Sequence, residues 1–95
     1  MNSLIYARLS LQRALLGAVT PTLRAVYVDV DESAKKLFVS FFYDGEITDE
    51  LFDIVSTAMA EVDVPGYYEL DEHIERSDFP EKIPDRGNLI YLRKE

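Results

Sequence analysis

The chain has 95 residues, no cysteine, and 18 acidic against 10 basic residues, for a formal net charge of −8. This length is typical of a single domain, here residues 1–95. The lack of cysteine excludes a disulfide framework, a thiol nucleophile and cysteine-ligated zinc, and it favours a cytoplasmic location. The negative charge argues against nucleic acid as a partner, and no apolar run is long enough to span a membrane.

The first 24 residues differ from the rest in charge. They contain three arginines and no acid, a balance of +3, whereas the remaining residues carry 18 acids and seven basic residues, a balance of −11. Apolar residues at helical spacing predict an amphipathic helix here, ending at residues 20–21. Arg8 falls within its apolar arc, so the side chain either extends along the core edge to water or meets a carboxylate. The core-facing stripe and its flanks are Leu4, Leu11, Leu15 and Ala18, with Ile5, Leu9, Leu16 and Val19.

Two strands are predicted next, over residues 23–30 and 37–43. The first alternates, with Val26, Val28 and Val30 on one face. In the second strand both faces are largely apolar, which is typical of a central strand covered on at least part of each side. The polar turn between them predicts an antiparallel hairpin.

A second helix is predicted after the turn at residues 44–46. Thr48 is the expected N-cap, and the two acids that follow it suit the positive end of the helix dipole. The expected buried stripe comprises Leu51, Val55, Ala58 and Val62, widened by Phe52 and Met59.

The last third of the chain predicts two further strands. Residues 67–74 alternate and give a strand with one acidic face; residues 77–87 form a loop, and residues 88–93 form a short final strand. The order is therefore α-β-β-α-β-β. This order predicts an α+β fold in which two helices pack on one face of a four-stranded, mainly antiparallel sheet.

The sequence offers no catalytic motif, and it predicts no catalytic, cofactor-binding or metal-binding residue. His73 is the only histidine, no serine lies in a nucleophile elbow, and the four glycines are scattered. With 18 acids some carboxylates must lie close together, so a small carboxylate- or metal-dependent hydrolase remains as the weakest alternative. An adaptor or oligomeric subunit that pairs through a sheet edge beside residues 89–93 ranks above it, and the oligomeric state stays open.

The strongest compositional feature is the stretch 42–72, which has ten acids and no lysine or arginine. One interpretation is a solvated face that keeps the domain soluble. The other is recognition of a basic protein, such as a nuclease with a positive groove for phosphates, through tyrosines ringed by carboxylates. The candidate partner-binding residues are Tyr43, Asp44, Glu46, Asp49, Glu50, Asp53, Tyr67, Glu69 and Asp71.

Three segments, residues 24–31, 42–50 and 91–95, resemble a known family when taken with the leucine-rich opening helix. The chain is similar to small bacterial immunity-type proteins, which are encoded beside polymorphic or contact-dependent toxins. This resemblance implies a cytoplasmic, non-enzymatic inhibitor that binds its cognate toxin domain directly. Nuclease toxins are common in such systems, but the resemblance assigns no binding residue in this sequence.

Overall fold

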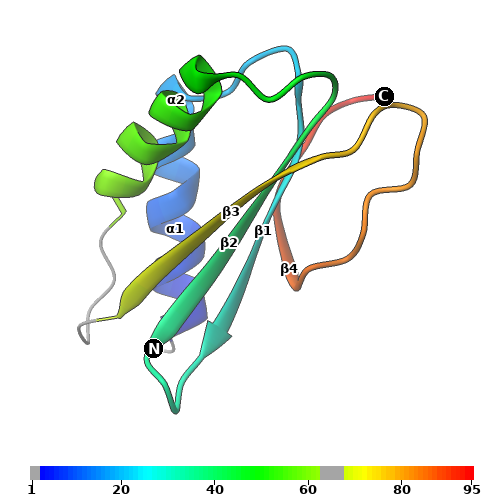
Figure 1. Cartoon of the computed structure of the whole chain (residues 1–95). Coiled ribbons are helices and arrows are strands. Elements are labelled where there is room, and N and C mark those ends of the chain that lie inside the picture. Colours follow the sequence, from blue (N-terminus) through cyan, green and yellow to red (C-terminus); the bar gives the residue numbers. More distant parts are fainter. Residues whose placement is uncertain (1–2, 63–67) are drawn as a thin grey trace.

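The computed structural model describes residues 3–62 and 68–95, and its elements follow the predicted order (Figure 1). They are α1 (Ser3–Ala14), the short 3-10 helix η1 (Leu15–Gly17), β1 (Leu23–Asp31), β2 (Lys36–Tyr43), α2 (Asp49–Ala60), β3 (Glu69–Arg76) and β4 (Asn88–Leu92). The predicted α+β fold is therefore confirmed. The first helix ends earlier than expected, because its last turn tightens and both Ala18 N and Val19 N donate to Leu15 O.

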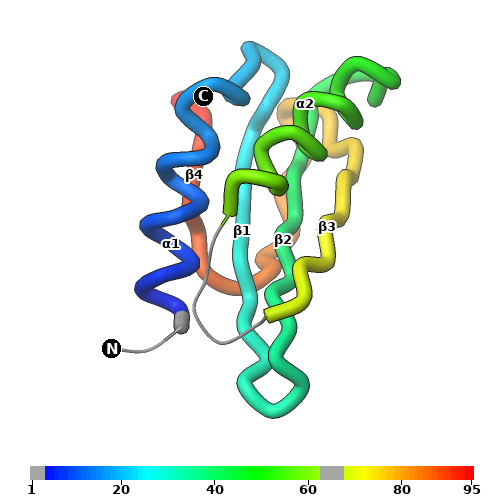
Figure 2. Tube along the Cα trace, turned by 90° about the vertical axis from the view of Figure 1, so that its left-hand side faces the viewer, coloured from blue at the N-terminus to red at the C-terminus, as the bar shows by residue number. Residues whose placement is uncertain are grey.

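The four strands form one mixed sheet in the order β3-β2-β1-β4. The β1–β2 and β1–β4 pairs are antiparallel, and the β2–β3 pair is parallel. The parallel pair follows from the position of α2, because a crossover helix returns the chain to the end of the sheet where β2 began. Both helices cover the same face of this sheet (Figures 1 and 2), as the sequence predicts.

The core lies between the sheet and the two helices. β1 contributes Val26 and Val28 to it, and β2 contributes alternate residues from Leu37 to Tyr43. In the first helical segment the predicted stripe is confirmed: Leu11, Leu15 and Ala18 are buried and Leu4 is half-buried, with Ala7 and Ala14 buried as well. The flanking apolar residues Ile5, Leu9, Leu16 and Val19 are exposed instead of widening the core.

Helix α2 begins as predicted, with the Thr48 side chain accepting a hydrogen bond from Leu51 N at 3.3 Å. Leu51, Val55, Ala58 and Met59 are buried against the core. Phe52 is 50% exposed, so the expectation that it widens this stripe is wrong. Each residue turns about 100° around the helix axis, and the turn after Leu51 carries Phe52 away from the core. Ile54 packs against the core cluster in its place.

The loop of residues 77–87 crosses the opposite face of the sheet (Figure 1). There the Arg86 guanidinium lies 5.9 Å from the centre of the Phe42 ring, which is fully buried. At Gly87, with φ of 117°, an added Cβ would lie 2.8 Å from Val28 O, so this close approach requires glycine. The prediction that β2 is a central strand covered on at least part of each side is confirmed, although Phe38 on it is exposed.

Candidate functional site

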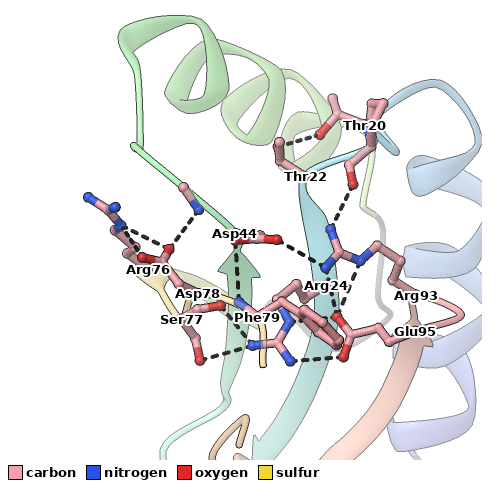
Figure 3. Close-up of polar contacts among 12 residues, drawn as sticks. Thr20, Thr22, Arg24, Asp44, Arg76, Ser77, Asp78, Phe79, Arg93 and Glu95 are labelled. Carbon is pink, nitrogen blue, oxygen red and sulfur yellow. Dashed lines mark hydrogen bonds and ion pairs between the residues drawn. The ribbon is translucent and has the colours of Figure 1, made fainter. Parts of the chain in front are cut away.

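A network of charged side chains lies at the end of the sheet where β1 starts (Figure 3). Arg24, only 3% exposed, is its centre. Its Nε and Nη2 donate to the two carboxylate oxygens of Glu95 at 2.6 and 2.8 Å, and its Nη1 donates to Ser77 O at 2.8 Å. Because the Arg24 hydrogen bonds stabilise the ionised form, with help from Arg93, the pKa of Glu95 falls to about 2.

Arg93 extends this network to Asp44. Its Nη2 lies 2.9 Å from Glu95 Oε2 and 3.2 Å from Asp44 Oδ2, while its Nη1 donates to Pro21 O at 2.9 Å. The other Asp44 oxygen accepts from Phe79 N at 3.3 Å. Asp44 was expected to bind a partner, but the structure places its carboxylate in contacts within the chain.

An adjacent ion pair fixes the connection that leaves β2. Arg76 Nε lies 3.0 Å from Asp78 Oδ1, and the same oxygen accepts from Gly45 N at 2.7 Å. The hydrogen bond from Arg76, reinforced by that of Gly45, lowers the pKa of the Asp78 carboxyl. Gly45 has φ of 92°, a conformation that glycine adopts without strain. The turn expected at residues 44–46 is therefore held in place by the end of β3.

Two tyrosines were predicted to anchor a partner. Tyr43 is fully buried, so it is a core residue and contributes no side chain to a surface. Within the described part of the chain its hydroxyl has no hydrogen-bond partner, and burial raises the pKa of Tyr43 to about 12. Tyr67 lies outside the described residues.

The remaining acidic candidates are exposed, but they belong to two different surfaces. Glu46 precedes α2, and Asp49, Glu50 and Asp53 lie on it, in the helical layer. Glu69 and Asp71 alternate along β3 with Leu70, which packs against the core on the helical side. Their side chains therefore lie on the opposite face of the sheet, and the described candidate acids are divided between two surfaces.

Two of the helical-layer acids, Glu50 and Asp53, line a groove between α1–η1 and α2 that has a volume of about 260 Å³. We call it the interhelical groove. One wall is made of small residues, and the other carries three carboxylates. The lining residues are Ala14, Gly17 and Ala18 from the first wall, and Glu50, Asp53, Ile54, Thr57, Ala58 and Glu61 from the second. None of the three carboxylates forms an ion pair with a residue in the described ranges 3–62 and 68–95.

A protein-family comparison bears on the use of these surfaces. The model of the MafI2 immunity protein family matches residues 5–95, almost the whole chain. This chain belongs to the MafI2 immunity protein family. The resemblance to immunity-type proteins of toxin systems is thereby confirmed, and membership implies interaction with a cognate toxin. A comparison with curated proteins gave no match.

The three segments that carry the resemblance meet in the Arg24 network of this MafI2 family member. Residues 24–31 supply Arg24, residues 42–50 supply Asp44, and residues 91–95 supply Arg93 and Glu95 (Figure 3). In this structure these side chains bind one another, so their role here is to hold the fold together.

Arg8 and His73 of this MafI2 family member both lie outside the interhelical groove. Arg8 is exposed and makes no ion pair with a described residue, so its side chain reaches water. His73 is exposed on the sheet face opposite the helices, in a hollow of about 550 Å³ that also contains Asp71 and Arg86. Among the described residues there is no group of three or more potential metal ligands, and no helix is long and apolar enough to cross a membrane.

The sequence predicts only part of the interhelical groove. Glu50 and Asp53 are among the predicted partner-binding residues, whereas Glu61 and the residues of the opposite wall are not. A signal was available, because Ala14, Gly17 and Ala18 recur at i, i+3 and i+4 and thus share one side of a helical segment. The pairing of that side with α2 depends on the tertiary fold.

Proposed function

We propose that this MafI2 family member neutralises its cognate toxin domain by direct contact, through the acidic surface of its helical layer. The partner surface is basic, and the inhibitor catalyses no reaction. Its place of action is the cytoplasm. A nuclease suits this role, since it carries positive charge for binding phosphates.

The observation that carries this proposal is the set of unmatched carboxylates in the helical layer. Their side chains are exposed, and none makes an ion pair with a described residue; they are Glu46, Asp49, Glu50, Asp53 and Glu61. Every ion pair in the described part of the chain uses other acids. Unmatched charges of one sign attract an oppositely charged partner and accelerate encounter.

The test uses the product of the neighbouring toxin gene, in a catalytically inactive form. We expect co-purification of the two proteins, rescue of growth when the active toxin is co-expressed, and an association rate that falls steeply as salt is added. Absence of binding contradicts the proposed function. Binding whose association rate does not change with salt contradicts the basic partner surface.

A second candidate function, that of an adaptor or oligomeric subunit, is favoured by the other side of α1. There a groove of about 300 Å³ is lined mainly by apolar residues of the first helical segment and of the edge strand β4. Leu16, one of its lining residues, is 85% exposed, and β4 also carries the exposed Leu89 and Leu92. Pairing of β4 edges between two copies would cover these side chains.

Sedimentation over a wide concentration range tests this second candidate. If the protein is an oligomeric subunit, we expect a dimer, and we expect Leu16→Glu to dissociate it by placing a charge in the interface. A monomer at all concentrations contradicts self-assembly.

A further inference from the structure

The interhelical groove combines an apolar wall with an acidic wall, and this combination selects its occupant. We infer that the groove receives a lysine or arginine side chain of the toxin, carried on a segment that lies along α2. This inference rests on the proposed function and specifies where the partner docks and by what chemistry.

The wall formed by α1 and η1 suits the hydrocarbon part of such a side chain. Ala14 and Ala18 are small and largely buried, and Gly17 has no side chain. A Cβ added at Gly17 meets no other atom within 4 Å, so open space lies directly above its backbone. Lysine and arginine bury their methylene groups against apolar surface while the charged head extends to a polar environment.

The wall formed by α2 suits the charged head. Glu50, Asp53 and Glu61 lie along the same side of the helix, over a length of about 16 Å at the rise of an α-helix. Residues 1–23 contain no acid, so the negative charge of the groove comes from α2 and its C-cap residue Glu61. A cation in the groove lies between the two helices and close to these carboxylates, which attract it. The length of the acidic wall accommodates a segment with more than one basic residue.

Two other concavities of the described structure lack this combination. The hollow on the sheet face opposite the helices contains its own cation, Arg86, which pairs with Glu75 at 3.4 Å. The groove between α1 and β4 has no charged side chain in its lining. Charge complementarity with a basic partner therefore favours the interhelical groove over both.

The first test fills the groove with a bulky side chain. We expect Gly17→Phe to weaken binding of the inactive toxin domain by at least about 30-fold, as loss of a central interface contact does. The matched control is Leu16→Phe, one residue away and exposed outside the groove, which should change the dissociation constant by less than about threefold. Circular dichroism and thermal unfolding verify that both variants fold. Equal affinities of Gly17→Phe and the unaltered chain overturn the inference.

The second test reverses charge inside and outside the groove. Asp53→Lys/Glu61→Lys and Glu69→Lys/Asp71→Lys each change the net charge from −8 to −4, because each replaces two acids with two lysines. Both pairs slow long-range encounter to a similar degree, but only the first places cations in the groove. We expect the groove pair to raise the dissociation constant at least about 10-fold more than the β3 pair does.

The two levels of the proposal fail in different ways. If the unaltered chain does not bind the toxin domain, the proposed function is wrong and the inference is wrong with it. If the unaltered chain binds and the β3 pair weakens binding as much as or more than the groove pair, the docking site is wrong while the inhibitor function stands.

Discussion

Two charged regions of this protein differ in how their charges are balanced. In the Arg24 network two guanidinium groups face two carboxylates, and both guanidinium groups also bind backbone carbonyls. In the interhelical groove three carboxylates face small apolar residues, and no cation of the described chain pairs with them. In the sequence both regions appear only as charged residues, and the structure shows which of these charges are paired.

This difference indicates which charges serve the fold and which are available to a partner. A buried charge that loses its partner destabilises the native state, so a matched network is costly to disrupt. Exposed charges of one sign contribute little to stability and can repel one another. Changes in the Arg24 network should therefore lower stability, whereas changes in the interhelical groove should lower toxin affinity.

The largest effect is expected from Arg24→Met. This change removes the bidentate contact with Glu95 and leaves Ser77 O without its donor, in a site that is 97% buried at Arg24. We expect a loss of about 2–4 kcal/mol in the free energy of unfolding, measured with urea.

The matched control for that change is Arg86→Met. Arg86 also pairs with a glutamate and lies over a phenylalanine ring, but its side chain is 43% exposed. Its loss should cost less than about 1 kcal/mol. Equal losses for Arg24→Met and Arg86→Met would show that burial of the network is not what makes it stabilising.

Acid should weaken the network through Glu95. The pKa of this carboxyl is about 2 in the folded chain, against a usual value of 4.5, so the unfolded state binds a proton first as the pH falls. The stabilisation from ionised Glu95 is complete above about pH 5 and is lost as the pH falls towards about 2. The free energy of unfolding of Glu95→Gln should therefore approach that of the unaltered chain over this range. A constant difference between the two curves contradicts this assignment.

Tyr43→Phe tests the boundary between surface and core. Because the buried hydroxyl has no partner among the described residues, its removal should leave stability unchanged or raise it by about 1 kcal/mol. Toxin binding should not change, since no part of the side chain is exposed. Tyr6→Phe, at a half-exposed ring, serves as the control. A loss of more than about 1 kcal/mol specific to Tyr43→Phe would reveal a partner for the hydroxyl.

Local signals in the sequence were sufficient for most of the secondary structure. The Thr48 cap, the strand alternation and the turn at residues 44–46 depend on neighbouring residues, and all three are confirmed. The prediction that Tyr43 lies on a binding surface is wrong, and the sequence contains the reason. Alternation placed it on the same strand face as Leu37, Val39 and Phe41, all core residues, so the pattern itself contradicted its assignment to a binding surface.

The charged regions depend on contacts between distant residues, and the sequence therefore does not resolve them. Arg24 and Glu95 are 71 positions apart, and the groove pairs residues 14–18 with residues 50–61. Alternation along β3, with Leu70 packed against the core, places Glu69 and Asp71 on the face of the sheet opposite the helices and so away from the acids of α2. Composition measures the amount of acidic charge, whereas topology determines which acids share a surface.

The smallest effect is expected from neutralising the groove, with Asp53→Asn/Glu61→Gln. These exposed carboxylates have no ion-pair partner in the described chain, and Asp53 lies one turn from the like charge of Glu50. We expect the free energy of unfolding to change by less than about 0.5 kcal/mol while affinity for the toxin domain falls. Arg24→Met should instead lower the free energy of unfolding and leave toxin affinity unchanged, at temperatures where the variant remains folded. The two opposite responses distinguish a binding surface from a structural one. A large loss of stability in the groove variant would mean that these acids hold the two helices together, and the contrast between the two regions would then be wrong.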